Sequence, residues 1–163
     1  MNISLVRIDD RLIHGQVTTA WLRQYPADVI FVIGDSVAAN PFQKTVLQTT
    51  APAGVTVEVM DTATAAAELN RRSQENRKVA LILTKPGDIV YLVQHGIPIR
   101  SVNVGGMQPH SGSRQIAKSV SVDKSDEEAF RQLFEKGVEL EIRMVPTDKK
   151  QDVARLLGFG RSG

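Results

Sequence analysis

Seven short, mainly apolar runs are spread along the chain, and they constrain the fold more than any other feature of the sequence. Each run has the length of a strand, and the runs at 29–33 and 79–83 are apolar throughout, which is typical of strands buried on both faces of a sheet. We expect strands at residues 3–8, 29–33, 55–60, 79–83, 101–104, 119–122 and 140–145. A sheet of this kind requires helices on both of its faces.

Helix signals separate most of these runs. Asn40 and Pro41 form a favourable N-cap and first-turn pair, Asp61 precedes an alanine-rich stretch, and a capping-box spacing begins at Ser125. We expect helices near residues 16–22, 41–48, 63–76, 86–96, 125–136 and 148–157. The alternation predicts an α/β fold: a single-domain, open, mostly parallel β-sheet with helices on both faces. We place this domain at residues 1–158 and expect 159–163 to be a flexible tail.

Loops that leave the carboxyl ends of parallel strands meet at one edge of the sheet, which is the usual place for a ligand. In this chain those loops carry His14, residues 34–36, Thr84 with Lys85, and residues 105–107. We therefore expect these segments to converge on one site.

His14 lies just beyond the first expected strand, at a junction with a helix. An imidazole that carries a phosphoryl group needs one exposed nitrogen and a second nitrogen held in one tautomer. Asp9 or Asp10 is placed to accept the far N–H, and a carboxylate partner also raises the basicity of the ring. Taken alone, a histidine beside a loop is more often a structural residue, so the interpretation rests on its neighbours.

Donors for phosphate oxygens are found on both sides of this histidine. Arg11 offers a planar fork, and the N–H groups of Gly15, Gln16 and the residues after them lie at the positive end of a helix dipole. The simpler interpretation of Arg11 is a surface ion pair with a neighbouring aspartate.

Other candidates for phosphate binding are weaker. Gly105 and Gly106, followed by Met107, allow either a close backbone approach to a ligand or a tight turn with positive φ. Thr84 ends a strand on the same edge. His95 fits the end of a helix, where a cationic ring complements the dipole, and His110 lies on a loop rich in Gly, Ser and Pro with nothing nearby to order it.

Composition narrows the functional classes. The formal charge is +2, aromatic residues make up 5% of the chain, and there is no cysteine. These values argue against nucleic-acid binding and exclude thiolate catalysis and cysteine-based zinc sites. Neither a phosphate-binding Walker motif nor a G-x-S-x-G elbow occurs, and no run is long enough to span a bilayer. We expect a cytoplasmic protein with no cofactor and no metal.

Three stretches resemble one known family, the B components of the mannose, fructose and sorbose branch of the sugar phosphotransferase system. They are Arg7-Ile8-Asp9-Asp10-Arg11-Leu12-Ile13-His14-Gly15-Gln16-Val17, then Val102-Asn103-Val104-Gly105-Gly106-Met107, then Gln115-Ile116-Ala117-Lys118-Ser119-Val120-Ser121-Val122-Asp123. The first string is highly specific, whereas the glycine string is specific mainly in combination. The likeness covers nearly all of the chain before the final helix.

The resemblance implies a phosphotransferase that accepts a phosphoryl group from a phosphorylated A component and passes it to a sugar entering through membrane C and D components. It implies that His14 is phosphorylated, on Nδ1 by the family pattern, that Arg11 binds the phosphoryl group, and that Asp10 supports the loop or orients the ring. Residues 105–107 would flank the site. It also implies an association with the membrane transporter from the cytoplasmic side.

Two alternatives use the same loop. One is a regulatory module that binds a phosphorylated ligand and is never phosphorylated itself. The other is a metal-dependent hydrolase with Asp9, Asp10 and His14 as ligands, although the adjacent aspartates would point apart on a regular strand.

Overall fold

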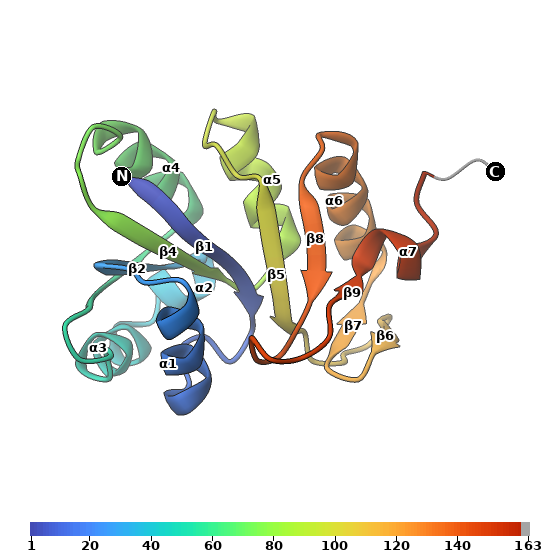
Figure 1. Ribbon diagram of the computed structural model, residues 1–163, viewed down its shortest axis with the longest axis horizontal. Helices are drawn as coiled ribbons and strands as arrows, with labels where there is room; N and C mark the ends of the chain where they lie inside the picture. Colours follow the sequence, from blue (N-terminus) through green and yellow to red (C-terminus); the bar gives the residue numbers. More distant parts are fainter. Residues whose placement is uncertain (161–163) are drawn as a thin grey trace.

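A seven-stranded sheet forms the centre of the molecule in the computed structural model, which describes residues 1–160 (Figure 1). The strand order is β3-β2-β4-β1-β5-β8-β9, and every pairing is parallel except that of β8 with β9. The strands are β1 (Asn2–Asp9), β2 (Val29–Ile33), β3 (Thr56–Met60), β4 (Lys78–Leu83), β5 (Ser101–Gly106), β8 (Glu139–Ile142) and β9 (Gln151–Asp152). The predicted α/β class is confirmed.

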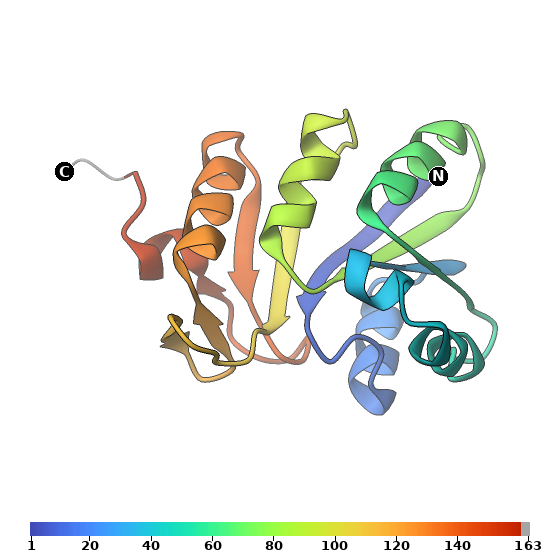
Figure 2. The ribbon, with the colours of Figure 1, turned by 180° about the vertical axis from the view of Figure 1, so that it is seen from behind.

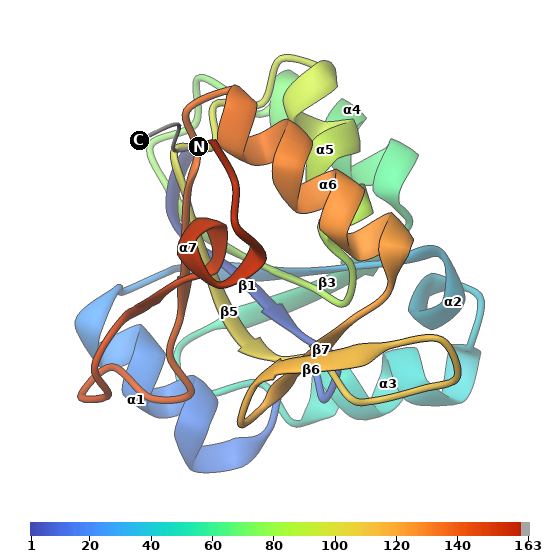
Figure 3. The same ribbon diagram turned by 90° about the vertical axis from the view of Figure 1, so that its right-hand side faces the viewer.

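Helices cover both faces of this sheet. On one face lie α1 (Gly15–Gln24) and α3 (Pro41–Thr49), with the short α2 (Asp35–Ala38) at the edge. The other face carries α4 (Thr62–Arg71), α5 (Pro86–Gln94) and α6 (Lys124–Glu135), with α7 (Val153–Leu157) beside them (Figures 2 and 3). Within residues 1–160, no helix combines the length and apolar character that crossing a membrane requires.

The caps of two helices are those that the sequence predicts. Asn40 Oδ1 accepts from the Gln43 N–H at 3.0 Å, and Asp61 Oδ1 accepts from the Thr64 N–H at 2.7 Å. The predicted capping box at Ser125 is wrong, because the box joins Asp123 and Asp126. A carboxylate at the N-cap accepts the N–H more strongly than a hydroxyl does, and Ser125 Oγ donates to the same Asp123 side chain.

The C-terminal third departs most from the prediction. The run at 119–122 is β7 (Val120–Val122), which pairs antiparallel with β6 (Arg114–Ala117) in a separate two-stranded sheet. The helix expected over 148–157 is shorter, because residues 151–152 pair with β8 as β9 and Asp152 then caps α7. Phe159, expected in a flexible tail, is buried against Phe134, so the core extends past residue 158. Residues 161–163 of that tail lie outside the described residues.

The carboxyl end of β1 is a topological switch point. After β1 the chain enters α1 on one face, whereas after the adjacent β4 it enters α5 on the opposite face. The two connections diverge and leave a crevice at the end of β1, which is where open α/β sheets bind ligands. Residues 10–14 lie directly in this position.

Candidate active site

Strand β1 sends alternate side chains to opposite faces of the sheet. Val6 and Ile8 join the apolar cluster under α4, α5 and α6, whereas Arg7 and Asp9 point toward the α1 side. Both charged residues are buried, Arg7 with 4% and Asp9 with 0% of its surface exposed. Buried charges require partners, and these two are paired with each other at 3.1 Å.

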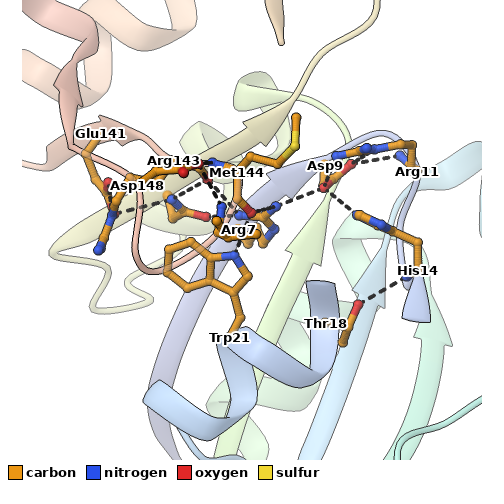
Figure 4. A network of polar contacts seen from close by, with 12 residues as sticks. Arg7, Asp9, Arg11, His14, Thr18, Trp21, Glu141, Arg143, Met144 and Asp148 are labelled. Carbon is orange, nitrogen blue, oxygen red and sulfur yellow. Dashed lines mark hydrogen bonds and ion pairs between the residues drawn. The ribbon is translucent and has the colours of Figure 1, made fainter. Parts of the chain in front are cut away.

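Asp9 is the centre of the site (Figure 4). Its Oδ2 accepts from His14 Nε2 at 2.9 Å, from Arg7 Nη2 at 3.1 Å and from Arg11 Nη2 at 3.2 Å. Its Oδ1 accepts from Arg11 twice, from Nε and from the backbone N–H, each at 3.1 Å. One carboxylate therefore holds two guanidinium groups and one imidazole in fixed positions.

These contacts keep Asp9 ionised. Burial favours the neutral acid, but hydrogen bonds from Arg11 and His14 outweigh that effect and hold the pKa of Asp9 below its ordinary value. An anionic acceptor on Nε2 requires that nitrogen to carry the proton. In the neutral ring, Nδ1 then has an available lone pair.

The backbone of the loop positions the ring. A turn closes with the Leu12 N–H donating to the Asp9 carbonyl at 2.9 Å, and Leu12 takes a positive φ of 63° while its side chain is buried. A non-glycine residue in this region stores strain that the surrounding structure must offset. The His14 N–H donates to Thr18 Oγ1 at 3.1 Å, and the His14 side chain stays 24% exposed.

Helix α1 starts beside the imidazole without a side-chain cap. His14 occupies the N-cap position and makes no capping hydrogen bond, and the first turn has no acidic residue. Gly15 and Gln16 are both exposed there. The first N–H groups of a helix have no partner inside it, so this end is suited to an anion.

Asp10 does not orient the ring, contrary to one of the two roles predicted for it. Its Oδ2 accepts from the Gln108 N–H at 2.6 Å and so ties the loop after β5 to the loop after β1. Asp10 and Thr84 line a separate hollow of about 170 Å³, away from the one beside Arg11. Asp10 thus has a loop-supporting position, and Thr84 is not brought to the imidazole.

Gly105 and Gly106 are not a tight turn, because both lie in β5 and neither has a positive φ. A Cβ on Gly105 would overlap the Arg7 guanidinium, and a Cβ on Gly106 would lie 3.1 Å from Asp9 Oδ1. The alternative prediction, a close approach to the backbone, describes these glycines better. The group that approaches them is a side chain of β1 and not a ligand. These glycines make room for the buried ion pair.

A hollow of about 440 Å³ opens beside Arg11 and contains Met107, Gln108 and His110 in its lining. His110 is more ordered than expected: its N–H donates to Ser113 Oγ at 2.9 Å, and its ring Nε2 lies 3.4 Å from Asp123. His95 fits the structural interpretation, since it ends α5 and stacks on Tyr91 at 4.0 Å.

Sequence reasoning missed Arg7 as a site residue. Besides Asp9, its guanidinium donates to Asn103, to the Arg143 carbonyl at 3.1 Å and to the Met144 carbonyl at 3.0 Å. A charged residue two places before Asp9, inside a run that is otherwise buried, was the available signal. The Asp9 contacts also argue against a metal site, because both carboxylate oxygens are occupied by N–H donors.

The fold and this arrangement define a class: an α/β protein with a carboxylate-held histidine, an arginine and an open helix N-terminus at the switch point of its sheet. A comparison with known protein families supports a specific family for this chain. The family model for the PTS system sorbose subfamily IIB component matches residues 3–162. The chain therefore belongs to the IIB components of the phosphotransferase system, as the resemblance predicted, and is a phosphotransferase that moves phosphoryl groups from an EIIA component toward a sugar.

Relatives match over nearly the whole chain. The sorbose-specific EIIB component of Lacticaseibacillus casei is 44% identical and is covered to 93%, with 94% of this chain aligned. The mannose-specific EIIAB component of Escherichia coli K12 is 45% identical over 96% of this chain, which spans 49% of that longer protein. The crystal structure of the IIBSor domain from Klebsiella pneumoniae superposes with a TM-score of 0.94 at 37% identity, covering 97% of each chain.

Proposed function

We propose that His14 Nδ1 is the atom that receives the phosphoryl group from a phosphorylated A component and then delivers it to the sugar. The observation that carries this proposal is the 2.9 Å contact between His14 Nε2 and the buried Asp9 carboxylate. An anionic acceptor on Nε2 favours the tautomer that carries its proton there, and this supports Nδ1 as the nucleophile.

The transfer consists of two in-line displacements at phosphorus. In the first, the Nδ1 lone pair forms a new P–N bond while the P–N bond to the donor histidine breaks and that imidazole leaves. In the second, a sugar hydroxyl oxygen attacks phosphorus, the P–Nδ1 bond breaks with its electron pair returning to Nδ1, and the hydroxyl proton passes to solvent. Between the steps the ring carries both a phosphoryl group and the Nε2 proton, and Asp9 stabilises its positive charge.

The transferring group is a dianion, and the site offers positive charge and neutral donors on two sides. Arg11 is 37% exposed, so it presents guanidinium N–H groups toward solvent while still bound to Asp9. The N–H groups of Gly15 and Gln16 lie at the start of α1. We assign phosphoryl binding to these three residues, with Gly106 and Met107 at the rim of the Arg11 hollow.

Partial exposure is suited to a carrier, because two partners must reach the same nitrogen in turn. We propose that the A component docks first over the carboxyl edge of the sheet and that the membrane C and D components, with the sugar, use the same edge afterwards. Because only one arginine and a few amides face the phosphoryl group, the site also avoids holding it so tightly that onward transfer becomes unfavourable.

Labelling tests the assignment of His14. The protein is incubated with radioactive phosphoenolpyruvate, the general phosphotransfer proteins and a cognate A component. Acid-labile label is expected on the unmodified protein and on the His95→Ala variant, and none on the His14→Ala variant. His95 is a matched control since it lies at the end of α5, against Tyr91. Equal labelling of His14→Ala would rule out His14, and absence of label on all three would rule out a carrier.

A further inference from the structure

We propose that Arg7 is a buried positioning residue for phosphoryl transfer, which fixes the Asp9 carboxylate and through it the orientation of the His14 ring. The inference rests on the proposed role of His14. It concerns a residue that touches neither His14 nor the hollow beside Arg11.

Four directional contacts fix the Arg7 guanidinium. Nη2 donates to Asp9 Oδ2 and to the Met144 carbonyl at 3.0 Å, and Nη1 donates to Asn103 and to the Arg143 carbonyl at 3.1 Å. Only a planar fork with several donors in one plane can make all four at once. Arg7 therefore ties Asp9 to both β5 and the segment that follows β8 (Figure 4).

The residues around Arg7 fit the shape of its guanidinium group. The guanidinium carbon lies 4.9 Å from the ring centre of Trp21, and Trp21 Nε1 donates to the same Met144 carbonyl that Arg7 uses. On the β5 side, Gly105 leaves the space that the guanidinium fills. A side chain held by an aromatic ring, two strands and a loop keeps a single position.

The two arginines that bind Asp9 have different roles. Arg7 has 5% of its side chain exposed and is committed to the interior, whereas Arg11 has 37% exposed and faces the incoming phosphoryl group. When Arg11 turns its charge toward the phosphoryl group, Asp9 still needs a cation, because it is buried. Arg7 supplies this permanent charge and so keeps the ring in place during the reaction.

The first test reads the ring directly and requires no phosphorylation. Protein with ¹⁵N-labelled histidine is examined by NMR for the hydrogen-bonded Nε2–H signal of His14. The signal is expected in the unmodified protein and in Arg72→Met, and it is expected to be lost to exchange in Arg7→Met. Arg72 is a matched control because it also pairs with carboxylates and lies 5.4 Å from an aromatic ring centre, Phe31, but has no contact with Asp9.

The second test separates positioning from donor binding. In phosphorylation kinetics with the A component, Arg7→Met is expected to lower kcat by about tenfold or more while KM changes less than twofold. Arg7→Lys keeps the charge but not the fork, so we expect it to recover part of kcat. Arg72→Met should retain the kcat of the unmodified protein.

Gly105→Ala keeps the proposal testable if Arg7→Met does not fold. Its new Cβ would displace the guanidinium without changing Arg7 chemically, so it should also lose the Nε2–H signal and lower kcat. If folded Arg7→Met or Gly105→Ala keeps both the signal and kcat, Arg7 is only structural and the inference is wrong. If the unmodified protein is never phosphorylated on His14, the proposed function fails, while the NMR result still reports on Arg7 and Asp9.

Discussion

Asp9 Oδ2 lies 2.9 Å from His14 Nε2, and the two residues belong to different elements, since Asp9 ends β1 and His14 occupies the N-cap position of α1. The strand therefore fixes the position of the Asp9 carboxylate, and the turn between Asp9 and His14 fixes the position of the imidazole ring. A histidine held in this way has a fixed tautomer and a fixed ring orientation before any partner binds. This preorganisation reduces the entropic cost of aligning Nδ1 with the phosphorus atom.

Replacing Asp9 by asparagine removes the charge while nearly keeping the shape. We expect phosphorylation of Asp9→Asn to be slower by about 10²-fold or more, because an amide offers no anion to hold the Nε2 proton. Rapid-quench labelling with the A component measures this rate. A rate within threefold of that of the unmodified protein would show that the contact does not orient the ring.

The same substitution should destabilise the fold. It leaves Arg7 buried beside a neutral group, and breaking one partner of a buried ion pair costs about 3–5 kcal/mol. For a chain of this size the melting temperature should fall by roughly 6–20 °C. Calorimetry measures the fall, and Arg114→Met, which breaks a surface pair with Glu127, should change the melting temperature little.

Asp10 is expected to act on the loop rather than on the chemistry. Its Oδ2 accepts from the Gln108 N–H at 2.6 Å, so Asp10→Ala releases the start of the 108–113 loop, at a cost of about 1.5–3 kcal/mol for a hydrogen bond to a charged group. Hydrogen exchange of amides in this loop should become faster, while phosphorylation slows much less than in Asp9→Asn. Unchanged exchange at Gln108 would contradict the anchoring role.

Gly106 tests how closely β5 approaches the site. A Cβ there would lie 3.1 Å from Asp9 Oδ1 and 3.3 Å from Arg11 Nη2, so both groups would have to move by a few tenths of an ångström. We expect Gly106→Ala to slow phosphorylation about threefold to tenfold, since small displacements at the reacting centre reduce rates steeply. Gly87→Ala is the control: it has open space in α5 and should stabilise the protein by roughly 0.5–1 kcal/mol without changing the rate.

The sequence predicts the sheet well because its strands are rich in apolar residues. Strand β2 is apolar throughout and has the bounds expected for it, with all five residues buried. It predicts the C-terminal third less well. The strands β6 and β9 are short, and all of their residues except Ile116 and Ala117 are polar, so no apolar period marks them. Their pairing comes from tertiary contacts that a local pattern does not encode.

The candidate site, like the fold, could be predicted from the sequence only in part. His14, Arg11 and the candidate aspartates are visible as a local string, and their arrival at one sheet edge follows from the parallel topology. The choice between Asp9 and Asp10 depends on which face each side chain takes at the last residue of a strand, and strand ends are uncertain by a residue or two. The role of Gly105 depends on Arg7, which lies almost a hundred residues away in the sequence, so no local signal reveals it.

Asp88 allows a test of how the ionisation of a partly buried carboxyl group affects stability. Burial raises the pKa of Asp88 above the ordinary 3.8, and the nearby charge of Asp35 raises it further. The folded state thus binds this proton more tightly than the unfolded state, so the contribution of Asp88 to stability falls as the pH rises above 3.8 and through its folded pKa. At neutral pH the ionised group opposes folding.

Asp88→Asn should therefore unfold at a higher urea concentration than the unmodified protein at pH 7, and this advantage should shrink as the pH falls through the folded pKa of Asp88 toward 3.8. Asp61→Ala is expected to behave in the opposite sense. The Thr64 N–H lowers the pKa of Asp61, so its stabilising contribution is present above pH 3.8 and is lost as the pH falls through the folded pKa. Removing this cap should cost about 1 kcal/mol at pH 7 and less in acid. Parallel urea titrations at pH 7 and pH 3 measure both variants, and a loss of stability in Asp88→Asn at pH 7 would show that its partners outweigh its burial.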